Sequence, residues 1–158
     1  MGVLRKTDVG VMIIPRYREV LQGTDISLNH RNKAANLYRH PDALQDPTTS
    51  FTKQHDLYSL GVVMIEIACW KAMEDLFAHH KEFQGEECKE DDIQKIRGIL
   101  LGNQGAQGNL NDVAFRTGSI YAKVVEVCLK GDFGADDGEE LYESFQRRVI
   151  RELDRCVI

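Results

Sequence analysis

The stretch DLYSLGVVMIEIACW, residues 56–70, decides the fold of this chain. Its apolar residues fall on every side of the helix that it predicts, and Glu66 is the only acidic side chain after Asp56. A helix that is apolar all round is buried inside a protein. We therefore expect a central, buried helix over residues 57–70. Asp56 is the predicted N-cap, because its carboxylate can accept hydrogen bonds from backbone N–H groups of the first turn.

The length and charge of the chain bound its class. Its 158 residues are enough for one domain, which at this size buries roughly 70% of the surface that the unfolded chain exposes. The net charge of −5 argues against nucleic acid as a partner, because DNA and RNA bind basic surfaces. Acidic residues gather at 86–92 and 136–140. These features predict a globular domain that does not bind nucleic acid.

Neither apolar segment of the chain is suited to a membrane. Residues 57–70 are too few to span a bilayer and include Glu66. Residues 9–14 are too short for the apolar part of a signal peptide and are interrupted by a glycine.

The cysteines show no CxxC or zinc-binding spacing, and Cys69 and Cys128 lie in apolar runs typical of a core. We expect a soluble, cytoplasmic chain with no membrane span and no metal site.

Helical periodicity predicts four further helices after Trp70. They span residues 72–83, 91–101, 118–130 and 139–156. The glycine-rich stretch 102–111 is a predicted loop, and residues 131–138 are a predicted turn. Before the central helix we expect a short strand at 11–14 and at most one turn of helix after Pro41.

The last predicted helix carries two regular patterns. Its apolar residues are four apart, at Leu141, Phe145, Val149 and Leu153. The only dense basic patch of the chain alternates with them, at Arg147, Arg148, Arg151 and Arg155. We interpret these arginines as a solvated helix face rather than as a phosphate or partner site.

Two short motifs resemble the C-terminal lobe of protein kinases. Residues 38–42, YRHPD, stand where kinases have the motif that ends Ala-Pro-Glu, and residues 56–61, DLYSLG, stand where they have Asp-x-Tyr/Trp-Ser-x-Gly. The separation of the two motifs also matches. The amino-acid sequence of these segments is most similar to that of the kinase-like domains of filamentous fungi, which are often joined to HeLo or prion-inhibition domains. The resemblance covers roughly residues 36–158.

The resemblance implies a mainly α fold: a truncated, helical, protein-kinase-like C-lobe that lacks the β-rich N-lobe. Residues 1–35 are then an irregular segment, holding at most a remnant of the activation segment, and residues 36–158 form the lobe. In such lobes the first aspartate of the central helix accepts hydrogen bonds from the catalytic loop, and the glycine permits close backbone approach. The motif positions implied as structural sites are Tyr38, Pro41, Asp42, Asp56, Tyr58, Ser59 and Gly61.

One motif position departs from the kinase pattern. Kinases have glutamate where this chain has Asp42, and that glutamate pairs with a late arginine. Because aspartate is one methylene shorter, the corresponding ion pair is in doubt. Its arginine is left open among Arg147, Arg148 and Arg151.

The residues that kinase chemistry needs are missing. Phosphoryl transfer requires a Gly-rich loop, a strand lysine, a catalytic-loop aspartate and magnesium ligands, all of which precede the Ala-Pro-Glu position. Only about forty residues precede Pro41 here. The triplet Asp132-Phe133-Gly134 spells the magnesium motif but comes too late in the chain, after a predicted helix, so we expect a turn. In HRNKAAN, residues 30–36, an asparagine replaces the catalytic aspartate, and we expect a polar loop.

The resemblance therefore implies a truncated kinase-like C-lobe of a signalling protein, without catalysis of its own. The alternative is a pseudokinase-type protein-interaction or scaffold module in fungal non-self recognition. ATP and magnesium are implied only for an intact family member, and no residue of this chain is assigned a catalytic, cofactor-binding or metal-binding role. A protein partner or the missing N-lobe is expected. Without the catalytic loop, one side of helix 57–70 should lack its cover and expose an apolar patch.

Overall fold

The computed structural model describes residues 33–45, 51–80, 90–102 and 108–156. The chain divides into Met1–Arg31 and Asn32–Ile158, and every described residue belongs to the second unit. The described residues form helices and turns, with no strand among them, which confirms a mainly α fold. The predicted strand at 11–14 lies outside the described residues.

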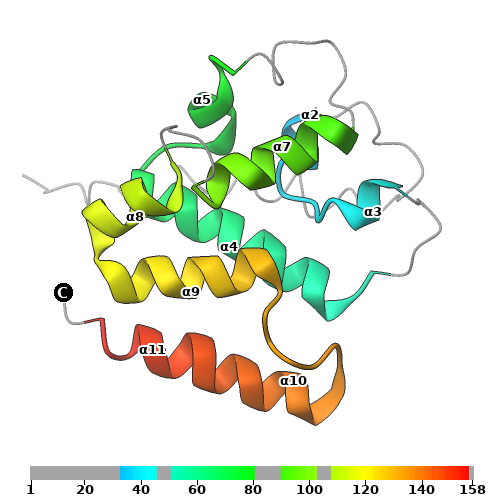
Figure 1. Cartoon of the computed structure of the whole chain (residues 1–158), viewed down its shortest axis with the longest axis vertical. Helices are drawn as coiled ribbons and strands as arrows, with labels where there is room; N and C mark the ends of the chain where they lie inside the picture. The colour runs from blue at the N-terminus through cyan, green and yellow to red at the C-terminus, as the bar shows by residue number, and fades with distance from the viewer. Residues whose placement is uncertain (1–32, 46–50, 81–89, 103–107, 157–158) are drawn as a thin grey trace, which may run out of the picture. The chain divides into compact units, whose positions relative to one another are not determined.

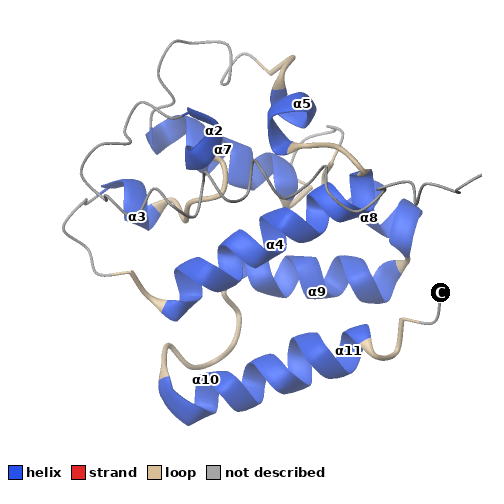
Figure 2. Cartoon of the chain, turned by 180° about the vertical axis from the view of Figure 1, so that it is seen from behind, coloured by secondary structure: helices blue, strands red, loops and turns tan. Residues whose placement is uncertain are grey.

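Helix α4, Lys53–Cys69, runs through the middle of the described helices. Helix α9, Ser119–Lys130, lies along one side of it and helix α8, Leu110–Thr117, contacts both (Figure 1). Both views place the C-terminal helix on the far side of α9 (Figure 2). The short helices α2, Lys33–Asn36, and α3, Asp42–Gln45, lie on the opposite side of α4. The central place expected for residues 57–70 is therefore observed.

The start of α4 differs from the prediction. Thr52 is the N-cap, with an extended backbone, and its N–H donates to Nδ1 of His55 across 3.4 Å. Because His55 is the third residue of the helix, this contact satisfies the backbone donor of the cap. The prediction of Asp56 as N-cap is therefore wrong. Asp56 lies within the first turn with an exposed side chain, where its charge still favours the positive end of the helix.

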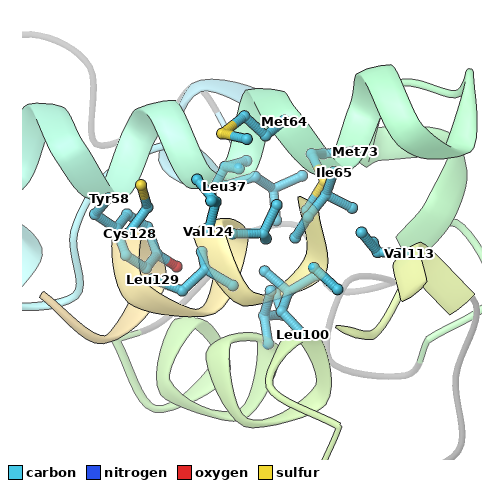
Figure 3. Packing of buried hydrophobic residues seen from close by; sticks show 14 of the residues in the cluster. Leu37, Tyr58, Met64, Ile65, Met73, Leu100, Val113, Val124, Cys128 and Leu129 are labelled. Carbon is cyan, nitrogen blue, oxygen red and sulfur yellow. The ribbon is translucent and has the colours of Figure 1, made fainter. Parts of the chain in front are cut away.

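Close contact between α4 and α9 depends on a glycine. A Cβ atom added to Gly61 would lie 2.9 Å from Cβ of Cys128 and 3.2 Å from a methyl carbon of Leu129. Further along the pair, the Tyr121 hydroxyl donates to the carbonyl of Met64 across 2.9 Å. Figure 3 shows the core that results, with side chains of both helices pointing toward one another.

The helices after α4 follow the predictions in part. Helix α5, Met73–Phe77, is shorter than predicted, since residues 78–80 are not helical. Helix α7, Glu90–Leu100, agrees with the prediction. Helix α8 was not predicted; Asn109 caps it by accepting from the N–H of Asp112 across 3.0 Å. The cap lies inside the glycine-rich stretch that was expected to be loop throughout.

The C-terminal helix contains a wide turn. It runs as α10, Gly138–Phe145, then as the π-helical segment η1, Gln146–Ile150, and ends as α11, Arg151–Leu153. A spacing of four residues exceeds the 3.6 of an α-helix, so a series at that spacing drifts around a regular helix. The wider π turn opposes this drift. It keeps the apolar series Leu141, Phe145, Val149 and Leu153 packed on the core.

None of the helices in the described part of the chain combines the length and the hydrophobicity that crossing a bilayer requires.

Candidate functional site

The structure brings the two motif segments into contact. The Ser59 hydroxyl lies 2.7 Å from the carbonyl oxygen of Tyr38 and 2.9 Å from that of His55, so its single proton is shared between them. The Tyr38 hydroxyl donates to Oε1 of Glu66 across 2.5 Å. Helix α4 therefore holds Tyr38 by its backbone and by its side chain, and the turn that follows α2 is fixed on the helix.

Glu66 joins three parts of the chain. Its Oε1 accepts from the Tyr38 hydroxyl and, across 2.7 Å, from the backbone N–H of Met73 at the start of α5. Hydrogen bonds to a charged acceptor are the stronger kind. In the sequence, Glu66 stands out only as an interruption of an apolar run. A lone acid in such a helix must find donors, and this signal could have identified it.

Three rings pack where the first motif meets the second. His40 stacks on His55 with ring centroids 5.1 Å apart, and meets Tyr58 edge-on, also at 5.1 Å. Burial lowers the pKa of His40; the Asp42 carboxylate opposes this, and His55 and Arg97 reinforce it. The neutral ring can then accept at Nδ1, which lies 3.2 Å from the N–H of Asp42. The histidines were not singled out from the sequence.

Tyr58 is buried with an unsatisfied hydroxyl. Only 1% of the residue is exposed, and its oxygen has no hydrogen-bond partner among the described residues. Burial raises the pKa of Tyr58 to about 12, although the positive charge of Arg97 opposes the shift. Asn36 Oδ1 and Arg97 Nε are likewise buried without a partner in the described part of the chain. An unpaired buried group of this kind costs about 1–3 kcal/mol.

The remaining motif residues take different positions. Pro41 is buried and Asp42 is exposed. Among the described residues, Asp42 lies near the ring of His40, at 3.6 Å, and forms no ion pair with a late arginine. Arg148, one of the three arginines left open for that role, instead binds the carboxylate of Asp132 at 3.0 Å and its carbonyl at 2.6 Å.

The two apparent kinase motifs serve as ordinary structure. Asp132-Phe133-Gly134 is a turn between α9 and α10, as expected. Phe133 is buried in it, and its carbonyl accepts from the Ser144 hydroxyl across 2.6 Å. Residues 33–36 were expected to be part of a polar loop, and this is wrong, because they form helix α2. Residues 30–32 of the same stretch lie outside the described residues.

One side of α4 is exposed to solvent. The residues on it recur at helical spacing, and we call this surface the α4 flank: Asp56, Leu60, Val63, Ile67 and Trp70. Leu60 and Val63 are half-buried, while Ile67 is 55% and Trp70 82% exposed. The expectation of a helix buried on every side is therefore wrong here. The expectation that one side would lack its cover is confirmed for the described residues.

Trp70 ends α4 in an unusual conformation. Its backbone is left-handed, with φ 54° and ψ 36°, and it is the only non-glycine residue with positive φ in the described part of the chain. This conformation disfavours any residue with a Cβ atom by roughly 1–2 kcal/mol. Glycine would fit the position better. An exposed tryptophan that is kept here despite the strain is a candidate contact residue, because tryptophan is enriched where proteins bind one another.

Cys69 and Cys128 are not suited to nucleophilic chemistry. Cys69 and Cys128 are buried, as expected for core positions. Burial raises the pKa of both thiols, to about 12 for Cys128. Both are therefore protonated near neutral pH, and a thiol is a poor nucleophile. No group of three or more potential metal ligands occurs among the residues that the structure describes.

No protein-family model, curated protein or solved structure matches the chain. The class of protein that the described residues define is a helical domain with a buried central helix and one uncovered apolar flank.

Proposed function

We propose that residues 36–158 form the helical large lobe of a protein-kinase-like signalling protein, and that this stretch has no catalysis of its own. The observation that carries the proposal is the joining of the two kinase-like motifs. The Ser59 hydroxyl and the Tyr38 carbonyl, one from each motif, lie 2.7 Å apart. The two motifs are therefore in contact in space as well as similar in sequence, and this supports a shared architecture.

The central position of α4 supports the same proposal. Gly61, the glycine of the second motif, lies where α4 and α9 approach too closely for a Cβ atom. The resemblance assigns the same role to that glycine. The close approach of the two helices at Gly61 therefore supports the proposal.

The α4 flank supports a binding role for this lobe. Ile67 and Trp70 expose apolar surface on a helix that a kinase-like fold covers on all sides. The proposed cover is a catalytic loop with its N-lobe, supplied by a longer form of the protein or by a second polypeptide. ATP and magnesium would then be held by residues of that part, since the Gly-rich loop, strand lysine and catalytic aspartate are not found in these 158 residues.

A second candidate function is a pseudokinase-type interaction module in fungal non-self recognition. The strained backbone of Trp70 favours it, because a residue that only awaited its own catalytic loop would not need an aromatic side chain at a glycine-like position. In this case the α4 flank binds a different protein, and no N-lobe is involved.

Co-expression tests the first proposal. The full chain is produced with a tagged N-lobe and catalytic loop from a kinase-like protein that carries the same two motifs. We expect the two to purify together, and Ile67→Glu with Trp70→Glu to abolish this. The control is Phe115→Glu, which alters an exposed aromatic residue on α8 rather than on α4. Failure of the folded wild-type chain to bind would contradict the proposed large lobe and leave the interaction module as the better account.

Isothermal titration with magnesium ATP tests the absence of catalysis. The chain alone should give no binding heat, because no residue set for nucleotide phosphates is present. Tight binding of magnesium ATP by the purified chain would show that these residues hold nucleotide. It would overturn the proposal that this stretch has no catalysis of its own.

A further inference from the structure

The outer face of the C-terminal helix carries its charges in two blocks. Four exposed residues follow one another at a spacing of four: Glu139, Glu143, Arg147 and Arg151. The first two lie on α10 and the last two on η1 and α11. The face is therefore acidic over its first half and basic over its second half.

The four charged residues lie along one line of the helix. They have the same spacing as the buried series that begins at Leu141, and the π turn of η1 lies within both series. Because that turn keeps the buried series on the core, it also keeps the charged series together on the outside. The charged face is exposed, whereas the series that begins at Leu141 packs on the core.

None of these four side chains forms an ion pair within the described residues, whereas the neighbouring Arg148 pairs with Asp132 and Arg155 with Glu152. Glu143 and Arg147 are one turn apart and attract each other, although exposed charges do so only weakly. Glu139 and Glu143 are one turn apart and repel each other, as do Arg147 and Arg151. An alternating order of the same residues would have avoided both repulsions.

The helix dipole explains only part of the pattern. It favours acids in the first turn and bases in the last turn, and its effect fades within those turns. Glu139 and Arg151 fit this rule. Glu143 and Arg147 lie in the middle of the helix, where a glutamate four residues before an arginine is weakly favourable, which offsets only part of the two like-charge repulsions.

We propose that this face binds a second copy of the chain, with the two C-terminal helices antiparallel about a two-fold axis near Phe145. The four charged residues are placed symmetrically about that position in the sequence. Glu143 then lies opposite the partner's Arg147, and Glu139 opposite the partner's Arg151. A two-fold interface must be complementary to itself, and a helix that is acidic at one end and basic at the other meets this condition.

The exposed apolar residues on the same face fit the arrangement. Tyr142 is 62% and Ile150 37% exposed, and Gln146 lies midway between them in the sequence. A two-fold axis at Phe145 places Tyr142 opposite the partner's Arg148, with the partner's Ile150 two residues further along and the charged line beside this contact. So small an apolar contact supports only a weak dimer that depends on the charge pairs. This inference is independent of the function proposed above.

Sedimentation velocity of the full chain tests the proposal. At about 0.01 M salt, where charges act over about 30 Å, we expect a concentration-dependent dimer. At about 0.5 M salt the dissociation constant should rise by tenfold or more, because screening weakens exposed charge pairs. A wild-type chain that stays monomeric at low salt and at concentrations above about 0.1 mM would overturn the proposal.

Charge reversal identifies the face. The acidic variant Arg147→Glu with Arg151→Glu, and the basic variant Glu139→Arg with Glu143→Arg, should each be monomeric alone. An equimolar mixture of the two should form a heterodimer. The variant with all four reversals should associate again, because its two halves are still complementary.

The control is Lys123→Glu, which changes an exposed charge on α9 and should leave self-association intact. Circular dichroism and thermal unfolding establish that each variant is folded. If the folded acidic and basic variants stay monomeric when mixed, or if either associates alone as the wild type does, the proposed face is wrong.

Discussion

The Tyr38 hydroxyl and the Glu66 carboxylate lie 2.5 Å apart and join the turn after α2 to the central helix. The two residues are 28 positions apart in the sequence, so the contact is a tertiary one. The same carboxylate oxygen also receives the N–H of Met73. A single acidic side chain thus connects three segments of the domain.

Replacing Glu66 by Leu should lower the free energy of unfolding by about 2 kcal/mol. The substitution leaves the Tyr38 hydroxyl and the Met73 N–H without their charged acceptor, and hydrogen bonds to charged groups contribute about 1.5–3 kcal/mol. Tyr38→Phe should cost about 1 kcal/mol and show strong coupling to Glu66→Leu in a double-mutant cycle. Urea denaturation measures all four forms. Additive effects of the two substitutions would contradict the contact.

Replacing Gly61 by Ala should lower the free energy of unfolding by about 1–3 kcal/mol, although alanine is the better helix former. The new methyl group would meet Cβ of Cys128 at 2.9 Å and force α4 and α9 apart. Cys128→Gly is itself destabilising because it places glycine inside α9, but in that background Gly61→Ala should cost less than in the wild type, since the atom that it meets is gone. Thermal unfolding compares the four chains. A more stable Gly61→Ala chain would show that the helices are not in close contact there.

Replacing Tyr58 by Phe should raise the free energy of unfolding near neutral pH by about 1 kcal/mol. The substitution removes a buried hydroxyl that has no partner among the described residues and keeps the ring against His40. Urea denaturation near pH 7 measures the change. A loss of stability would mean that the hydroxyl has a partner that the described residues do not include.

Tyr58 should also make stability depend on alkaline pH. Burial raises its pKa to about 12 in the folded chain, from about 10 in the unfolded chain. The folded state therefore holds the proton more tightly, and this stabilisation is complete below pH 10 and lost as pH rises toward 12. The loss approaches about 3 kcal/mol. Denaturation across this range should show a shallower decline for Tyr58→Phe, while Tyr142→Phe, at the surface, should follow the wild type.

Replacing Trp70 by Gly should raise the free energy of unfolding by about 1 kcal/mol, because glycine adopts the left-handed conformation without strain. Ile67→Gly is the comparison, since it places glycine inside the helix and should destabilise by about 1 kcal/mol or more. Differential scanning calorimetry measures both. If Trp70→Gly is clearly destabilising, the tryptophan supports the fold, and its assignment to a contact surface loses its main argument.

The apolar run at residues 57–70 predicts the central helix but not the residue at which it starts. Thr52 and Asp56 are both good N-cap residues, and the apolar run alone does not distinguish them. The choice is made by His55, which reaches back to the N–H of Thr52. Helix α8 was missed for a related reason: it is short, and its cap lies in a stretch whose glycines predict loop.

Individual residues of the candidate site could be predicted from the sequence, but the contacts between them could not. The motifs identified Tyr38, Ser59 and Gly61 as positions that matter. The stacking of His40 on His55 and the donors of Glu66 depend on which segments meet in space, and no local pattern encodes that. The last helix is an intermediate case. The sequence shows that its apolar residues are four apart. This spacing alone did not predict the π turn that the structure contains at η1.

The turn at Asp132-Phe133-Gly134 warns against assigning chemistry from three letters. Here the aspartate anchors Arg148 and the phenylalanine is buried, so the triplet ties the end of one helix to the middle of another. Asparagine in place of Asp132 would abolish metal binding at a true magnesium motif. In this chain the same substitution should only weaken the surface ion pair between Asp132 and Arg148. A genome search for this triplet would therefore mistake a structural turn for an active site.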